Sequence, residues 1–114
     1  MFNLNELAVM AYENAAKREA KDGKVSTDTR IMLKHTATEV VEAMEAYTEL
    51  ARVREQNKDT EVCTFYDESQ FMSELADIVC CVLIIAEKEN VDMEYALTAC
   101  MEKNYKRAIG VGDK

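Results

Sequence analysis

The chain has 114 residues, which is enough for one domain with a small core, and we expect oligomerisation to add to that core. It has no proline, three glycines and 7% aromatic residues, a composition that disfavours a β-sandwich or barrel and favours helices. A net charge of −8 opposes binding to nucleic acid polymers and to anionic membrane surfaces. The sequence therefore predicts a single all-α domain over residues 1–114.

The chain shows no twenty-residue apolar span and no signal-peptide pattern, so we expect a cytoplasmic protein without a membrane segment. Its four cysteines have neither CxxC spacing nor histidine partners, which disfavours a zinc site. We expect Cys80, Cys81 and Cys100 to be small buried hydrophobes in a reducing compartment.

Apolar residues at three- and four-residue steps predict a first helix over residues 3–22. Gly23 can adopt the left-handed conformation that closes this helix. One of residues 26–28, all of them good capping types, can then begin a second helix over about residues 27–57.

The apolar stripe of the second helix includes two carboxylates, Glu39 and Glu42. Chance alone produces several such pairs in a chain with 22 acidic residues. Their direction is more informative than their spacing, because charges that belong to solvent, such as Lys34 and Arg52, lie on the opposite side. His35 lies on the same stripe, one turn before Glu39.

Residues 58–67 show no helical period and predict a connection, followed by a third helix over about residues 68–89. This third helix is apolar in almost every direction, which predicts a buried helix, yet it carries Glu74 and Asp77 on one face. Ionised carboxylates are costly to bury alone. We therefore expect these two to meet cations, hydrogen-bond donors or a metal ion.

Asp92 can cap a fourth helix that Gly110 closes. Asn104 interrupts the apolar stripe of this helix, and Lys103 and Arg107 flank that position. Taken alone, the pattern is equally consistent with an exposed, charged last turn that suits the helix dipole.

Long helices joined by a short connection pack antiparallel, so the second and third helices should bring Glu39, Glu42, Glu74 and Asp77 together. Four such carboxylates repel one another, and hard divalent cations with oxygen ligands relieve that repulsion. A di-iron site would need Glu-x-x-His pairs, whereas the single histidine, His35, precedes Glu39 by four residues. The pattern therefore predicts a Mg²⁺ site, with Mn²⁺ as a substitute.

Four segments resemble the MazG-like, all-α nucleoside triphosphate pyrophosphohydrolases: EVVE at 39–42, ELAD at 74–77, NVDMEYAL at 90–97 and EKNYKR at 102–107. The resemblance covers most of positions 30–109. It implies Mg²⁺-dependent hydrolysis of a nucleoside triphosphate to a monophosphate and pyrophosphate, as in removal of unwanted nucleotides from the cellular pool. It also implies a four-helix chain that forms an antiparallel bundle completed by oligomerisation, as a homodimer or homotetramer.

The resemblance assigns a role to each residue that matches it. Glu39, Glu42, Glu74 and Asp77 become metal ligands, and Lys103, Asn104 and Arg107 become contacts to the triphosphate. Glu39 is the candidate general base for a metal-bound water, and His35 is a candidate reader of the base edge. The 31 residues between Glu42 and Glu74 are more than that family usually has.

Two other functions remain open. Hydrolysis of phosphoribosyl-ATP ranks lower because the segments at 90–97 and 102–107 look more MazG-like. A non-catalytic helical module for nucleotide sensing or protein interaction would use the carboxylates only to pair with lysine and arginine across helices. The alternatives differ in their demand for metal, because only a site of convergent carboxylates requires a divalent cation.

Overall fold

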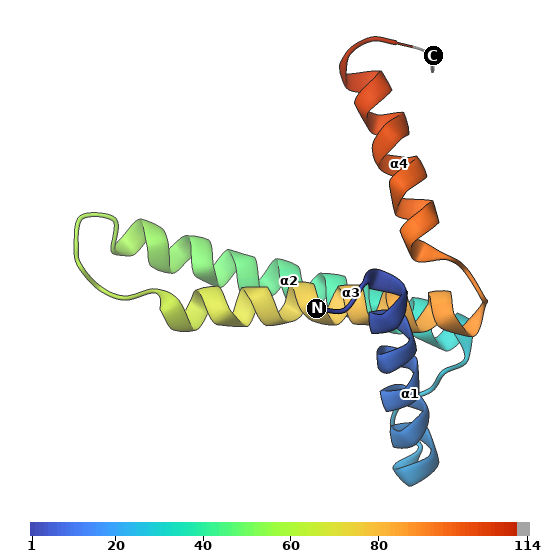
Figure 1. Ribbon diagram of the computed structural model, residues 1–114. Helices are drawn as coiled ribbons and strands as arrows, with labels where there is room; N and C mark the ends of the chain where they lie inside the picture. Colours follow the sequence, from blue (N-terminus) through green and yellow to red (C-terminus); the bar gives the residue numbers. More distant parts are fainter. Residues whose placement is uncertain (112–114) are drawn as a thin grey trace.

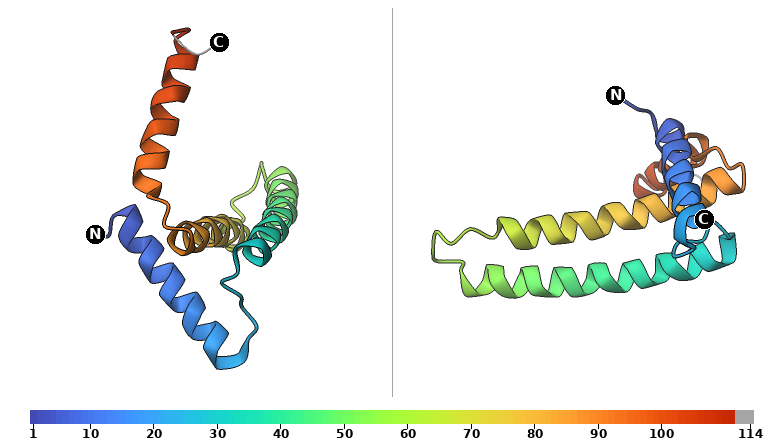
Figure 2. Two further views of the ribbon diagram at one scale, coloured as in Figure 1. Left: turned by 90° about the vertical axis from the view of Figure 1, so that its right-hand side faces the viewer. Right: turned by 90° about the horizontal axis from the view of Figure 1, so that it is seen from below.

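The computed structural model describes residues 1–111, which form four α-helices and no strand. The helices are α1 (Leu4–Asp22), α2 (Thr29–Gln56), α3 (Phe65–Lys88) and α4 (Met93–Ala108) (Figure 1). The all-α prediction is confirmed. As predicted, α2 and α3 pack side by side and antiparallel, and α1 crosses α3 near its C-terminal end (Figure 2).

Local capping signals set most of the helix ends where the sequence predicted them. Gly23, with φ of +70°, ends α1 in the left-handed conformation that other residues rarely adopt. The Asp28 carboxylate accepts hydrogen bonds from the backbone N–H groups of Arg30 and Ile31 at the start of α2. Asp92 caps α4 in the same way.

Helix α3 begins earlier than the sequence predicted, because Phe65–Asp67 belong to the helix and not to the connection. The Glu68 N–H donates to the Thr64 carbonyl at 3.0 Å, and the Thr64 hydroxyl donates to Glu68 Oε1 at 2.9 Å. Acidic residues in the first turn are also favourable at the positive end of a helix. Residues 57–64 therefore make the whole connection between α2 and α3.

The core lies where α1 crosses the α2–α3 pair. Ala15 of α1 packs with Met32 of α2 and with Cys81 and Ile84 of α3, and all four are buried. Further along the pair, Leu50 is the most completely buried side chain, with 1% of its surface exposed. The apolar stripes that predicted α2 and α3 are thus the surfaces that join them.

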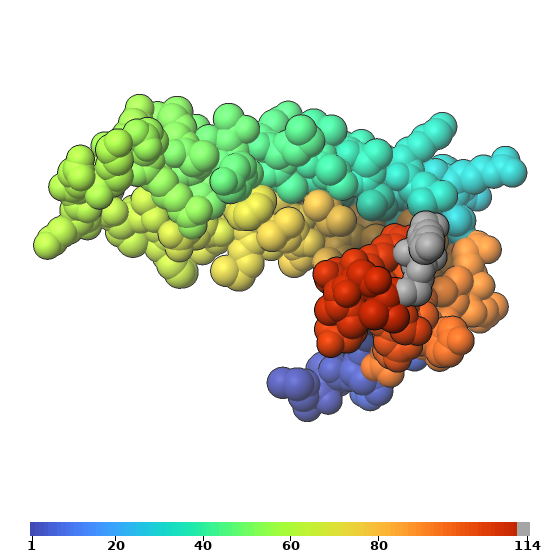
Figure 3. Space-filling view, turned by 90° about the horizontal axis from the view of Figure 1, so that it is seen from above, coloured from blue at the N-terminus to red at the C-terminus, as the bar shows by residue number. Residues whose placement is uncertain are grey.

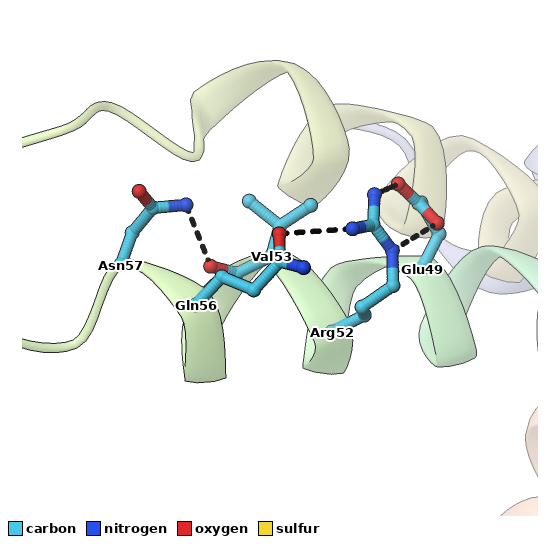
Figure 4. A network of polar contacts seen from close by, with 5 residues as sticks. All are labelled: Glu49, Arg52, Val53, Gln56 and Asn57. Carbon is cyan, nitrogen blue, oxygen red and sulfur yellow. Dashed lines mark hydrogen bonds and ion pairs between the residues drawn. The ribbon is translucent and has the colours of Figure 1, made fainter.

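The far end of α2 is held by polar contacts on the surface (Figure 4). The Arg52 guanidinium donates to Glu49 Oε2 at 3.0 Å and to Gln56 Oε1 at 2.9 Å, and the Asn57 side chain donates to the Val53 carbonyl at 2.9 Å. Exposed contacts of this kind contribute little to stability, so the stability of this end of the molecule comes mainly from packing between the helices.

Burial of α3 is less complete than the sequence predicted. Leu75, Val79 and Val82 are exposed, because α1 and α2 cover only part of its circumference. Cys81 is buried as expected, but Cys80 is exposed, since adjacent helical residues point about 100° apart and only one of them faces the core.

Helix α4 lies outside the three-helix bundle (Figures 1 and 3) and has no buried residue. It is tied to the start of α1, where the Leu4 N–H donates to Glu94 Oε1 at 3.0 Å and the Asn5 amide donates to Asp92 Oδ1 at 2.9 Å. The radius of gyration is 17.8 Å. A compact domain of this length would have about 13 Å, so the single chain is markedly extended.

By length and composition, α3 is also the one helix within residues 1–111 that could cross a membrane. The core helix of a soluble protein passes the same test. In this structure 22% of the apolar segment of α3 is buried. Glu74 and Asp77 lie inside that segment, where a bilayer would make ionised carboxylates costly.

Candidate metal centre

Three carboxylates from α2 and α3 converge. One oxygen from each of Glu39, Glu74 and Asp77 lies within 4.8 Å of the other two. The three-residue step between Glu74 and Asp77 places both on one face of α3, opposite Glu39 on α2. Oxygens bound on opposite sides of a cation, at about 2.0–2.6 Å each, lie about 4–5 Å apart. The separation therefore suits a shared divalent ion.

Two of these carboxylates each have a buried oxygen without a protein partner. Oε2 of Glu39 and Oε2 of Glu74 are buried and accept no hydrogen bond from the described residues. Glu39 as a whole is only 8% exposed. A buried, ionised oxygen without a donor costs free energy, and either a proton or a cation can remove that cost. The oxygen-only ligand set fits Mg²⁺ or Mn²⁺ better than a softer metal.

The electrostatics of the centre show the same need for positive charge. Burial raises the pKa of the Glu39 carboxyl, the negative charge of Glu42 raises it further, and His35 opposes the rise. Burial likewise raises the pKa of Glu74, again with help from Glu42. Both shifts mean that the protein favours a bound cation or proton at these oxygens over two free negative charges.

Glu42, the fourth predicted ligand, lies at the edge of this centre. Its side chain is exposed and is not one of the three converging groups, yet its charge acts on both Glu39 and Glu74. The three-residue step from Glu39 places Glu42 on the same side of α2, next to the three converging carboxylates. Glu42 can reach a bound ion only from the solvent side.

His35 lies next to the centre. Its Nε2 is 3.1 Å from Glu39 Oε1, and about half of its side chain is exposed, at 52%. This contact orients the Glu39 carboxylate and occupies one of its two oxygens. The predicted role of His35 in reading a nucleobase stays a prediction.

A cavity of about 470 Å³ opens beside the carboxylates, between α1 and the α2–α3 pair. Glu39 and Asp77 line it on one side, while Asn14 and Arg18 of α1 and Lys24 of the following connection line it on the other. The volume falls within the usual range for small-molecule sites. No motif in the sequence marks Arg18 or Lys24 as site residues. Arg18 continues the face of α1 that carries Ala11 and Ala15, Lys24 follows the end of α1, and the crossing of α1 over α3 brings both to the cavity.

The predicted triphosphate contacts lie elsewhere in the single chain. Lys103, Asn104 and Arg107 are exposed in the C-terminal half of α4, which projects away from the carboxylates (Figure 1). The Asn104 amide lies 3.6 Å from Cys100 Sγ on its own helix. The structure brings together the acidic part of the predicted site but not these three residues.

A scan against models of known families, a search of curated proteins and a search of solved structures each found no match.

Proposed function

We propose that this protein is a Mg²⁺-dependent hydrolase that converts a nucleoside triphosphate to a monophosphate and pyrophosphate. One observation carries the proposal: buried oxygens of Glu39 and Glu74 without donors converge with Asp77 beside a cavity of nucleotide size. A triphosphate carries about four negative charges, so an acidic protein needs bridging cations to hold it. Removal of unwanted nucleotides from the cellular pool is the role we propose for this activity.

The chain's own residues have distinct tasks in this reaction. Glu39, Glu74 and Asp77 would hold the cation, and Glu42 would approach it from the solvent side. When bound, Mg²⁺ neutralises charge on the phosphate oxygens and makes water a better nucleophile. Glu39 is the carboxylate we propose as proton acceptor for the attacking water, with His35 fixing its orientation at 3.1 Å. No covalent nucleophile is required, because such reactions depend mainly on positioning and electrostatics.

Incubation with a panel of canonical and modified nucleoside triphosphates plus Mg²⁺ tests the proposal directly. We expect equal amounts of monophosphate and pyrophosphate. Millimolar chelator should abolish this activity, and Mn²⁺ should restore it. Turnover that persists unchanged in chelator, or release of orthophosphate in place of pyrophosphate, would contradict it. Phosphoribosyl-ATP belongs in the same panel, since a strong preference for it would favour the alternative hydrolase.

The structure offers an argument against a purely structural role for the carboxylates. A salt-bridged helical module would pair them with lysine or arginine, but no lysine or arginine of α1, α2 or α3 forms an ion pair with Glu39, Glu74 or Asp77. The ion pair of the centre involves His35. A titration with Mg²⁺ or Mn²⁺ without nucleotide separates the two roles, because only a metal centre binds the ion in a one-site manner.

We further propose that the chain acts as a cytoplasmic homodimer or homotetramer. Large apolar side chains are exposed on all four helices, and Met44 on α2, Met72 on α3 and Met101 on α4 are each more than 60% exposed. A second copy that covers these surfaces would supply the core that one chain lacks. Light scattering coupled to size exclusion should give a mass of two or four chains, and a monomer at micromolar concentration would contradict the assembly.

A further inference from the structure

The two walls of the cavity carry opposite charge. Glu39 and Asp77 lie on the wall formed by α2 and α3, and Arg18 and Lys24 lie on the wall formed by α1 and the connection after it. Two cations and two carboxylates thus line one cavity of about 470 Å³. This arrangement suits a negatively charged ligand that carries a bound cation at one end. A phosphate chain with bound Mg²⁺ has this distribution of charge.

Neither cation is used elsewhere in the fold. Within residues 1–111, the side chains of Arg18 and Lys24 form no ion pair and donate no hydrogen bond. By contrast, Arg52 pairs with Glu49 and Lys58 pairs with Glu55 on the surface of α2, and Arg54 pairs with Glu68 of α3. Arg18 and Lys24 therefore keep their full donor capacity for a ligand.

The segment that carries Lys24 is tightly fixed. Its N–H donates to Asp22 Oδ1 at 2.9 Å, directly after Gly23 turns the chain. Thr27, only 5% exposed, donates from its N–H and its hydroxyl to the two oxygens of Glu19, at 3.0 and 2.9 Å. This double contact ties the connection back to α1, so Lys24 extends toward the cavity from a backbone of fixed position.

We infer that Arg18 and Lys24 bind the phosphate chain of the substrate from the α1 side of the cavity, opposite the metal centre. This inference rests on the proposed function and specifies it, because it assigns the phosphate-binding cations to α1 and its connection and not to α4. Arg18 has a planar fork of donors that suits two phosphate oxygens at once, and Lys24 adds a compact charge. The metal ion and these cations together balance the charge of the triphosphate.

Binding of inorganic tripolyphosphate in saturating Mg²⁺, followed by calorimetry, tests the inference without a base or sugar. We expect the wild-type protein to bind it, and Arg18→Ala and Lys24→Ala each to weaken binding about tenfold to a hundredfold, since each removes a charge-assisted contact. Arg18→Lys should recover part of the affinity because it keeps the charge and loses the fork. Circular dichroism confirms that each variant remains helical.

Lys17→Ala and Lys21→Ala are the matched controls, because both lysines are exposed on α1 and neither lines the cavity. We expect each to change affinity by less than about twofold. Equal losses in all four alanine variants would mean that only general positive charge matters, and would overturn the inference. Absence of tripolyphosphate binding by the wild type, or a loss seen with Lys103→Ala and not with Arg18→Ala, would overturn it as well.

The same measurements separate this inference from the proposed function. Nucleotide hydrolysis with unchanged tripolyphosphate binding in Arg18→Ala would leave the function standing and overturn the assignment of the cations. Specific loss of tripolyphosphate binding in a protein that hydrolyses no nucleotide would support the assignment of the cations and contradict the hydrolase.

Discussion

The α2–α3 pair and α4 are built from the same kind of sequence but differ in what they bury. Each has an apolar stripe at helical spacing, and an aspartate caps both α2 and α4. The pair buries Leu50, Cys81 and Ile84 along its stripes, whereas α4 buries none of its side chains. Helical periodicity and capping thus define where a helix forms. Which other helix it packs against depends on the length of the connection and on the surfaces of the neighbouring helices.

The predicted site residues differ in the same way: those on α2 and α3 come together, and those on α4 do not. Carboxylates from α2 and α3 converge because a short connection makes these helices antiparallel neighbours. The cations of α4 lie apart from the carboxylates, because α4 contacts the start of α1 and projects away from the α2–α3 pair (Figure 1). Their proposed contact with the triphosphate needs another arrangement, such as docking of α4 from a second copy against the cavity.

The largest expected effect lies in the α2–α3 pair. Glu74→Gln or Asp77→Asn should lower turnover about a thousandfold, because a catalytic metal contributes several kcal/mol to the barrier. Helical circular dichroism should survive, and the metal-free melting temperature should rise because crowded charge is removed. Glu45→Gln, an exposed carboxylate on α2, is the control and should change little. Unfolding of the site variants, with turnover following the folded fraction, would assign these residues a structural role.

A comparison of two leucines measures what each region buries. Leu50→Ala should lower the free energy of unfolding by about 3 kcal/mol, since it leaves a cavity in the α2–α3 interface. Leu97→Ala on α4 should cost less than about 1 kcal/mol in a monomer, because Leu97 is 38% exposed. Chemical denaturation at several protein concentrations checks both. A larger, concentration-dependent loss for Leu97→Ala would show that a second copy covers α4.

Lys103→Ala tests whether α4 reaches a site at all. If α4 of a neighbouring copy contacts the phosphates, kcat/KM should fall about tenfold, equivalent to about 1.4 kcal/mol. Lys106→Ala is the control on the same helix, because Lys106 lies about 160° around α4 from Asn104, further than Lys103 at about 100°. Equal effects of the two variants would rule out a specific contact from α4 and leave the cavity cations as the phosphate ligands.

The smallest expected effect is on stability as a function of pH. Because the pKa values of Glu39 and Glu74 are raised by folding, the folded protein binds protons that the unfolded chain releases. Metal-free stability should therefore increase as pH falls from neutral toward the ordinary pKa of a glutamic acid, and decrease again as pH rises. Glu19, Glu49 and Asp92 have lowered pKa values, so their contributions are lost only at more acidic pH.

Thermal melts in chelator across this range measure the trend, and Glu39→Gln should flatten it. Saturating Mg²⁺ should also flatten it, since the ion replaces the protons at the same oxygens. Stability that rises with pH in chelator would contradict the proton uptake inferred for these two carboxyls.

The sequence was sufficient for the helices and for the convergence of three of the four predicted carboxylates. Periodicity over α2 and α3 placed Glu39 on one facing surface and Glu74 and Asp77 on the other, and the antiparallel pairing brought them within 4.8 Å. The contribution of α1 was not predictable in this way. Arg18 shares a face of α1 with Ala11 and Ala15, but its place in the cavity depends on the angle at which α1 crosses α3, which no repeat in the sequence encodes.

Side-chain exposure also depended on tertiary packing. Cys80 and Cys81 are equivalent by composition, yet only Cys81 faces Ala15 and Met32 in the core. The start of α3 at Phe65 depended on local contacts of Thr64 that carry no periodic signal.

The length of the α2–α3 pair has a consequence for how such a protein can vary. Most of the 31 residues between Glu42 and Glu74 are helical, since α2 continues to Gln56 and α3 starts at Phe65. This part forms a rod that extends beyond the carboxylates (Figure 2). Adding or removing about seven residues in both helices, or two turns, would keep their facing sides aligned. Doubling the connection at its tip would cost only about 0.6 kcal/mol. The rod is thus a spacer whose length can change while the carboxylates at its base stay in register.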